Sequence, residues 1–191
     1  MSAATARRTD PSRKEVTHER IVGAAARAIR RSGYDGTGVA DIMNEAGLTH
    51  GGFYAHFPSR DAMLAEAADR AGAESVAFLE GVAEAAPPQK ALRALIRYYL
   101  SEEHVAGVET GCPVAALGSE MRRQAPKVRR AATRRIKDLI DLVARHSLDQ
   151  DALVTVATMV GALVLARAVA DPKLSKAVRQ ASLKHFDSSG V

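Results

Sequence analysis

Residues 37–57 constrain the fold of this chain more than any other stretch, because they indicate two short helices joined by a tight turn. The apolar residues of the first half recur at i, i+3, i+4 and i+7, the spacing of one helix face. They are Val39, Ile42, Met43 and Ala46. We expect the Thr37 hydroxyl to cap the start of this first helix. We expect Gly47 to end it, because glycine enters the left-handed conformation at little cost.

The second helix of the pair is expected at about residues 50–56, with Thr49 as its cap. Phe53 and Phe57 are four residues apart and therefore share its buried face. The other faces carry short or polar residues, namely His50, Gly51, Gly52, Tyr54 and His56. This pattern is typical of a helix-turn-helix, in which the second helix faces a partner.

The adjacent glycines Gly51 and Gly52 need an explanation, because each costs roughly 1 kcal/mol relative to alanine inside a helix. They could allow another helix of the same chain to pack closely. They could instead bring the helix backbone against a surface that leaves no room for a Cβ atom, such as a DNA strand. We favour the DNA interpretation, because hydroxyl and imidazole groups that can donate to phosphates and bases lie beside the glycines.

The composition favours an all-α protein, because alanine is abundant and only 4% of the 191 residues are aromatic. The single cysteine, Cys112, excludes an internal disulfide, and no N-terminal apolar segment suggests secretion. The longest apolar stretch, residues 152–166, is too short to span a bilayer. We therefore expect a cytoplasmic protein without a membrane segment, which joins the nucleoid when it binds DNA.

The side chains give no sign of an enzyme, a metal site or a cofactor. The six histidines are not spaced as metal ligands, and the sequence has neither a glycine loop with a lysine nor a nucleophile elbow. We expect no catalytic residue and no bound cofactor. The net charge of +5 is compatible with nucleic-acid binding, but equally with ordinary solubility.

Three segments are expected along the chain. Residues 1–15 lack hydrophobic periodicity and carry several arginines, which predicts a disordered basic arm that is either solvated or follows a DNA groove. Residues 16–58 form a three-helix DNA-binding domain, whose first helix starts at the cap Thr17 and stops at Gly33. Residues 59–191 form a helical ligand-binding and dimerisation domain, which brings the total to about nine helices.

The second domain begins with a long helix, residues 59–85, that runs from the DNA-binding domain into the rest of the chain. A later helix at about 149–170 is apolar nearly all round, and such a helix must be covered on every side. We expect a second copy to supply the cover, so that residues 149–186 of two chains pair as a four-helix bundle. The alternative is a central core helix of a monomer.

The helix expected from residue 126 has an apolar face and a basic face. The basic positions are Lys127, Arg130, Arg134 and Lys137. They form either a second nucleic-acid patch or a solvated face that also meets the acidic middle segment of the chain. We favour the solvated face, because runs of like charge are usually hydrated.

The sequence resembles the tetracycline-repressor (TetR) family of transcriptional regulators. The segment "TGVADIMNEAGLTHGGFYAHFPSRDAML" (37–64), preceded by "THERIVGAAARAIRRSGYDG" (17–36), carries a close match. Two further stretches, "GCPVAALGSEM" (111–121) and "LARAVADPKLS" (165–175), resemble one branch of these regulators. The resemblance implies an α-helical homodimer that binds a palindromic operator, usually as a repressor, and is released by a small molecule in its C-terminal domain.

The resemblance also implies which residues contact double-stranded DNA. The recognition helix and its phosphate contacts fall on Thr49, His50, Gly52, Tyr54 and His56, with Gly51 among them. Thr37 and Val39 match the start of the supporting helix, and Arg60 matches a backbone-contacting position that is usually lysine. Because the exposed positions hold no Arg, Asn or Gln, we expect DNA binding to depend on phosphate contacts and shape.

Effector residues are less well defined, because this half of the chain diverges between family members. The candidates are Phe78, Tyr98, Tyr99, Cys112, Met121, Met159 and Leu163. Ordinary core packing explains each of them equally. A pocket of this composition is mostly apolar, which suggests a hydrophobic or aromatic effector.

Two other functions stay open at this point. Cys112 lies at the start of a helix, whose dipole favours a thiolate, so the protein could sense oxidants or electrophiles through this residue. A plain buried cysteine explains the position better. A nucleoid-type protein that binds DNA without sequence preference is the remaining possibility.

Overall fold

The computed structural model describes residues 12–147 and 151–188, and every regular element in these ranges is helical. This confirms the all-α prediction. The N-terminal half contains α1 (Arg13–Ser32), α2 (Val39–Glu45), the 3-10 helix η1 (His50–Ala55) and α3 (Arg60–Glu84). The C-terminal half contains η2 (Pro88–Lys90), α4 (Ala91–Tyr99), α5 (Glu102–Ala106), α6 (Pro113–Met121), α7 (Pro126–His146), α8 (Ala152–Ala168) and α9 (Pro172–Ser188).

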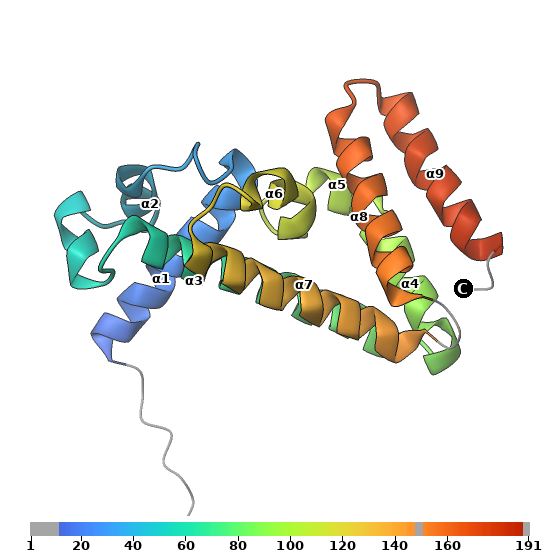
Figure 1. Cartoon of the computed structure of the whole chain (residues 1–191), viewed down its shortest axis with the longest axis horizontal. Helices are drawn as coiled ribbons and strands as arrows, with labels where there is room; N and C mark the ends of the chain where they lie inside the picture. The colour runs from blue at the N-terminus through green and yellow to red at the C-terminus, as the bar shows by residue number, and fades with distance from the viewer. Residues whose placement is uncertain (1–11, 148–150, 189–191) are drawn as a thin grey trace, which may run out of the picture.

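Helices α3 and α7 lie side by side and form the long axis of the molecule (Figure 1). The unit of α1, α2 and η1 lies at one end of this pair, and α4, α8 and α9 lie at the other. The two long helices approach closely at Gly72, where an added Cβ atom would come within 2.3 Å of the Arg135 Cβ. Gly72 therefore allows the backbones to meet at a distance that no larger residue permits.

Two separate hydrophobic cores lie along this axis. The first packs α1, α2 and η1 against the start of α3, and it includes Leu117 of α6 and Val128 of α7. The second lies among the end of α3, the end of α7 and helices α4 and α8, with Phe186 of α9 at its edge. Because α3 and α7 contribute to both cores, they connect the two ends mechanically.

The first helix begins earlier than the sequence suggested. Ser12, not Thr17, is the N-cap, and it forms a capping box in which Ser12 Oγ accepts from the Glu15 N–H and the Glu15 carboxylate accepts from the Ser12 N–H. Thr17 lies inside the helix and donates to the Arg13 carbonyl. Residues 13–15, the last three of the predicted arm (residues 1–15), therefore belong to α1. Residues 1–11 lie outside the described ranges.

The helix-turn-helix pattern is confirmed with two local corrections. Gly33 and Gly47 end α1 and α2 as predicted, and both have positive φ angles, 78° and 67°. Thr37 does not cap α2, because Gly38 holds the N-cap position and the Thr37 hydroxyl donates inward. The second helix of the pair is a 3-10 helix, and its N-cap Thr49 makes no side-chain capping bond.

The C-terminal half contains one helix that the sequence pattern did not predict. This helix is α5, in the polar stretch after α4, and Ser101 caps it by accepting from the His104 N–H. Helices α8 and α9 pack against each other as an antiparallel pair (Figure 1). The predicted start of the apolar helix, residue 149, lies within residues 148–150, which are outside the described ranges.

Candidate functional site

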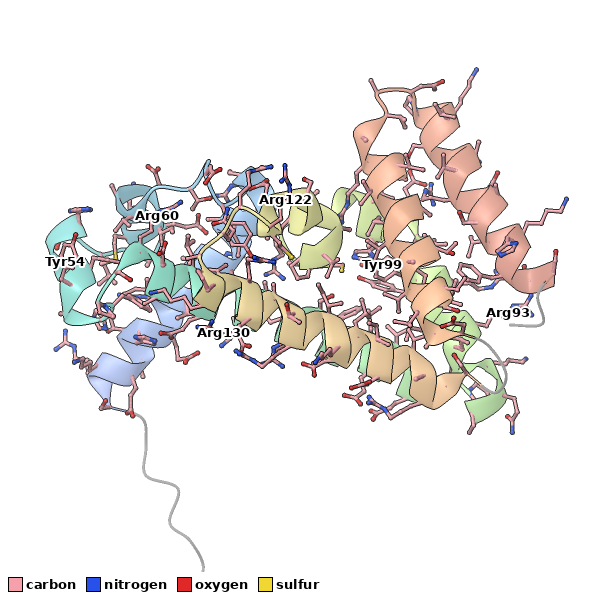
Figure 2. The ribbon with its side chains drawn as sticks, viewed as in Figure 1. Tyr54, Arg60, Arg93, Tyr99, Arg122 and Arg130 are labelled. Atoms are coloured by element: carbon pink, nitrogen blue, oxygen red, sulfur yellow. The ribbon has the colours of Figure 1, made fainter. Side chains whose placement is uncertain are left out.

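The recognition segment, residues 49–56, lies at the end of the molecule farthest from α9 (Figure 1). Phe53 is buried beneath it and stacks on Phe57 with ring centroids 5.6 Å apart, which fixes the segment to the first core. Tyr54 is 74% exposed, and its side chain points outward (Figure 2). Thr49 and His50 are also exposed. The anchored aromatic residue thus turns a short polar surface toward solvent.

The glycine pair of this segment makes no close contact with the described residues of the chain. A Cβ atom added to Gly51 would meet nothing within 4 Å. One added to Gly52 would meet only the Met43 Cε, at an ordinary 3.6 Å. The explanation by internal helix packing is therefore wrong. What remains is an exposed helix backbone that another molecule can approach without steric hindrance from side chains.

His56 behaves differently from the other recognition residues, because its ring faces the protein. Its Nδ1 is buried and has no hydrogen-bond partner among the described residues. Burial lowers the pKa of His56, and the nearby His18 and Lys14 lower this pKa further. His18 itself stacks on Phe57 at 4.5 Å and contacts the Glu66 carboxylate at 2.6 Å. His56 is therefore neutral at pH 7 and lies behind the exposed surface.

Three residues expected to contact DNA beside the recognition segment are turned partly or wholly inward. They are Thr37, Val39 and Arg60. Thr37 is buried, and its hydroxyl donates to the Gly33 carbonyl at 2.7 Å. Val39 is half-buried against the first core. Arg60 donates to the carbonyls of Tyr34 and Thr37, the latter at 3.1 Å. The side chains of Thr37 and Arg60 thus hold the connector between α1 and α2 in place.

Three side chains that the sequence analysis missed join this N-terminal unit to later helices. Glu120 of α6 accepts from the Tyr34 N–H at 2.9 Å. Arg31 pairs with Glu45 of α2 at 2.9 Å and with Glu109 before α6 at 3.0 Å. The partners of these contacts are up to 86 residues apart, so no local pattern could have revealed them.

A second network joins α1 to α3. The Arg30 side chain is 1% exposed and pairs with Glu74 at 2.9 Å. Arg70 contacts Glu74 at 2.7 Å and reaches Glu19 at 2.7 Å. For Glu74, burial raises the pKa, but the arginine partners outweigh burial and hold the pKa below its usual value. This chain of alternating charges fixes the first helix along α3.

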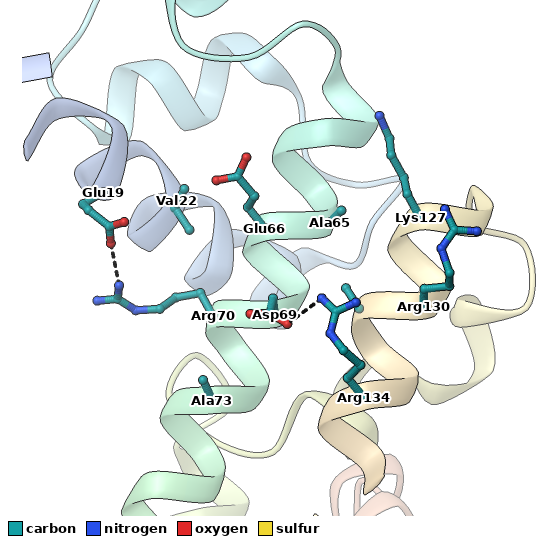
Figure 3. Close-up of a pocket in the computed structure, with 11 residues that line it drawn as sticks. Glu19, Val22, Ala65, Glu66, Asp69, Arg70, Ala73, Lys127, Arg130 and Arg134 are labelled. Carbon is teal, nitrogen blue, oxygen red and sulfur yellow. Dashed lines mark hydrogen bonds and ion pairs between the residues drawn. The ribbon is translucent and has the colours of Figure 1, made fainter. Parts of the chain in front are cut away.

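The basic face of α7 lines an open groove of about 510 Å³ between α1, α3 and α7 (Figure 3). Lys127 donates to the Ser59 hydroxyl at 2.9 Å, and Arg134 pairs with Asp69 at 3.0 Å. Arg130 and Lys137 are exposed. Two of the four basic positions are thus exposed and one, Arg134, meets the acidic α3 residue Asp69, which agrees with the solvated-face interpretation.

The effector candidates do not surround one open cavity. Tyr99, Cys112, Met159 and Leu163 are buried in the second core, whereas Met121 packs against the first. Phe78 is 53% exposed and its ring lies 4.7 Å from that of Tyr98. The crevice at this pair holds only about 10 Å³, less than a water molecule fills. Its lining residues are Ser75, Phe78, Leu79, Tyr98, His104, Thr110 and Gly111.

Cys112 lies between these candidates as the N-cap of α6. Its backbone N–H donates to the His104 Nε2 at 3.0 Å, and the His104 Nδ1 contacts the Tyr99 carbonyl at 2.7 Å. Since a carbonyl can only accept, Nδ1 carries the proton and His104 is neutral. Burial is the main cause that lowers the pKa of His104.

An apolar surface lies on α8 and α9. Leu153 is 60% exposed and Leu165 56% exposed, and three other large apolar side chains of these helices are also exposed. They are Val154, Val164 and Leu174. In contrast, Met159 and Leu163 on the opposite face of α8 are buried. One face of α8 therefore packs in the second core and the other remains without cover in a single chain.

None of the helices in the described part of the chain has the length and apolar character needed to cross a membrane. No group of three or more His, Cys, Asp or Glu side chains within the described ranges could hold a metal ion.

The helix-turn-helix and the all-helical domain behind it define a DNA-binding transcriptional regulator. The profile of the "Bacterial regulatory proteins, tetR family" matches residues 21–67. The chain is 33% identical over 167 residues to the uncharacterized HTH-type transcriptional regulator Rv0196 of Mycobacterium tuberculosis, covering 78% of this chain and 83% of that protein. This chain therefore belongs to the TetR family and is not an enzyme.

Solved structures of similar proteins share the fold. A TetR transcriptional regulator from Chloroflexus aurantiacus has a TM-score of 0.75 at 25% identity, covering 91% of this chain and 96% of that chain. AibR, solved in complex with isovaleryl coenzyme A and operator DNA, has a TM-score of 0.60 at 17% identity, covering 88% and 97% of the two chains. At that identity the second likeness concerns the fold alone.

Proposed function

We propose that this regulator binds a palindromic operator as a homodimer and represses transcription until a small molecule releases it. The observation that carries the proposal is the recognition segment, where a Cβ at Gly51 would meet none of the described residues within 4 Å and one at Gly52 would meet only the Met43 Cε. A nucleic-acid strand can approach such a backbone closely enough for N–H groups to reach phosphate oxygens. The domain division follows: a DNA-binding domain to residue 58, and a ligand-binding and dimerisation domain from residue 59.

Within the recognition segment the residues have different roles. Thr49, His50 and Tyr54 present exposed donors to phosphates and base edges, while Gly51 and Gly52 permit the approach. The inward-facing residues act by holding the recognition segment in position. They are Thr37, Val39, His56 and Arg60. DNA binding of this kind has weak base readout, because no exposed side chain offers a bidentate pair to guanine or adenine.

The apolar surface on α8 and α9 supports the homodimer. Five exposed aliphatic side chains on two adjacent helices are unusual in a monomer but suited to a four-helix interface. In a dimer the two recognition segments must be about 34–36 Å apart, so that they enter successive major grooves on one side of the duplex. A small molecule then releases the operator if it binds more tightly to a dimer conformation in which the spacing of the recognition segments is different.

An alternative effector mechanism through Cys112 has one specific observation in its favour. Arg167 and Tyr99 lie near the thiol, and a cationic neighbour favours a thiolate. Against it, Cys112 is almost fully buried, so an oxidant reaches it poorly. Labelling with iodoacetamide at neutral pH distinguishes a sensor thiol from a packed one, because only the sensor thiol reacts in the folded protein.

The decisive experiment is selection of operator DNA from a random library, followed by competition. A palindromic consensus, with binding that survives a large excess of non-specific DNA at physiological salt, supports the proposal. Binding that the competitor removes and that depends only on salt would instead support the nucleoid-type function. Sedimentation of the protein–operator complex gives the number of chains bound.

A further inference from the structure

Arg167 of α8 is a half-buried cation without a counter-ion among the described residues. Its Nη2 donates to the His104 carbonyl at 2.5 Å and its Nε to the Val105 carbonyl at 3.2 Å. Its Nη1 is buried and has no hydrogen-bond partner, and no carboxylate among the described residues pairs with it. Burial lowers the pKa of Arg167. A buried charge of this kind is costly unless an anion joins it.

The Tyr99 hydroxyl is a second buried donor in the same region, and the weak acceptor Cys112 is the group beside it. Tyr99 is fully buried on α4, beside α8 (Figure 2), and its hydroxyl has no partner among the described residues. Burial, and next the Cys112 thiol, raise the pKa of Tyr99, while the Arg167 charge lowers it. The phenol and the guanidinium both lie against His104, because the Tyr99 and His104 ring centroids are 4.7 Å apart and Arg167 donates to the His104 carbonyl. Two donors thus lack a strong acceptor there, with only the Cys112 thiol beside Tyr99.

A row of aromatic rings leads from the surface to these donors. The exposed Phe78 lies 4.7 Å from Tyr98, which stacks on His104 at 5.6 Å. The His104 ring in turn meets Tyr99 edge-on at 4.7 Å. The closed crevice between Phe78 and Tyr98 ends at His104 and Gly111. Phe78 lines the crevice and is 53% exposed, so entry of a ligand requires its side chain to rotate toward solvent.

The charges of this region define the ligand. His104 is neutral, because Nδ1 donates to the Tyr99 carbonyl and Nε2 accepts from the Cys112 N–H. Arg167 is therefore the cation that the ligand must balance. A guanidinium and a hydroxyl together suit a carboxylate, and a planar ring suits the stack of Tyr98 and His104.

We propose that Arg167 and Tyr99 bind the carboxylate of a small aromatic monocarboxylate, whose ring lies along Tyr98 behind Phe78. The proposal rests on the proposed function, because it names the chemical class of the effector. It also accounts for the two buried donors, because the ligand supplies the acceptor that the chain does not.

Benzoate tests the proposal directly, with binding to the full-length protein measured by calorimetry in the absence of DNA. Benzamide has the same ring without the charge, and cyclohexanecarboxylate has the charge without the aromatic ring. We expect benzoate to bind, both analogues to bind at least about tenfold more weakly, and Arg167→Gln to abolish binding. Tyr99→Phe should weaken binding about tenfold, because it removes one hydrogen bond to a charged group.

Tyr34→Phe is the matched control, because Tyr34 carries another buried tyrosine hydroxyl without a partner and lies in the first core. It should bind benzoate like the parent. Circular dichroism establishes that each variant is folded, and Tyr99→Phe keeps the test valid if Arg167→Gln does not fold. Equal binding of benzoate and benzamide, or undiminished binding by folded Tyr99→Phe, would overturn the proposal.

Further results distinguish a failure of this inference from a failure of the proposed function. Cys112→Ser should still bind benzoate; loss of binding in the folded variant would show that binding depends on the Cys112 side chain and would overturn the proposal. Arg167-dependent benzoate binding that leaves the operator complex intact supports the site and contradicts effector release. Operator release by other compounds, unchanged in folded Arg167→Gln, supports the proposed function and overturns this site.

Discussion

The carboxylate of Glu120 accepts a hydrogen bond of 2.9 Å from the backbone N–H of Tyr34. This contact joins α6 to the connector that positions α2 and the recognition segment. Gly33 precedes Tyr34 with φ 78°, and a Cβ there would come within 2.7 Å of a Glu120 oxygen. The conformation of the connector and the position of α6 therefore depend on each other.

Replacing Glu120 by alanine should lower the free energy of unfolding by about 1–3 kcal/mol, because the Tyr34 N–H loses its acceptor. Denaturant unfolding measures this change. Glu84→Ala is the control, since Glu84 is exposed at the end of α3. Equal stability of the two variants would show that water replaces the carboxylate at no cost, and would contradict the structural role given to Glu120.

Gly51→Ala should separate stability from DNA binding. We expect the variant to gain roughly 0.5–1 kcal/mol in stability, because alanine is better suited to a helix and its Cβ meets nothing within the chain. Operator affinity should fall at least about tenfold, because the same Cβ meets the DNA strand. Electrophoretic mobility shift and thermal unfolding give the two quantities.

The control for this substitution is Gly81→Ala, which adds a Cβ to an equally open position of α3. Gly81 lies far along α3 from the recognition segment, so it should gain stability and keep its operator affinity. If Gly51→Ala also keeps its affinity, the backbone at Gly51 does not approach DNA closely.

The sequence pattern predicted the helix-turn-helix well, because its signals are local. Gly33 and Gly47 adopt the positive φ angles that only glycine reaches easily, and Phe53 lies on the face that its spacing predicts. The errors have a physical cause as well. Ser12 and Thr17 can both cap a helix, and only the reciprocal bond with Glu15 decides between them.

Leu165→Glu should convert the proposed dimer to a monomer. Leu165 is 56% exposed on α8, so a carboxylate there is harmless in a single chain but is desolvated in a four-helix interface. Sedimentation velocity measures the change, and operator binding should fall with it. Ala77→Glu, at an exposed position of α3, should leave the mass unchanged. A Leu165→Glu protein that stays dimeric would place the interface elsewhere.

The ion pair between Asp69 and Arg135 should make stability depend on pH. Burial raises the pKa of Asp69, but the bonds to Arg135 at 2.6 Å and to Arg134 at 3.0 Å outweigh it, so the pKa is lower in the folded protein. The stabilisation is therefore complete above the unfolded pKa of about 3.9 and is lost as pH falls through the lower folded value.

Asp69→Asn tests this dependence through the unfolding temperature at several pH values. The parent should exceed the variant at pH 7, and the difference should shrink as the pH falls below about 4. Asp141→Asn, on the exposed side of α7, should show little difference at either pH. A difference between parent and Asp69→Asn that does not vary with pH would contradict the ionic origin.

The effector region could be predicted only as a set of residues, because its properties arise between distant helices. The sequence shows Tyr99, His104 and Arg167 separately, and nothing near any of them reveals a missing acceptor. Met121 looks like its neighbours in the pattern but packs against the first core. Burial and hydrogen-bond partners, which periodicity does not encode, distinguish these cases.

The length of α3 has a geometric consequence for both ends of the molecule. Its 25 residues span about 37 Å, and it contributes to both hydrophobic cores. If α3 pivots at one core by about five degrees, its opposite end moves by roughly 3 Å. This displacement equals a whole hydrogen-bond length. A repacking too small to change the shape of the second core can therefore move a phosphate contact out of range.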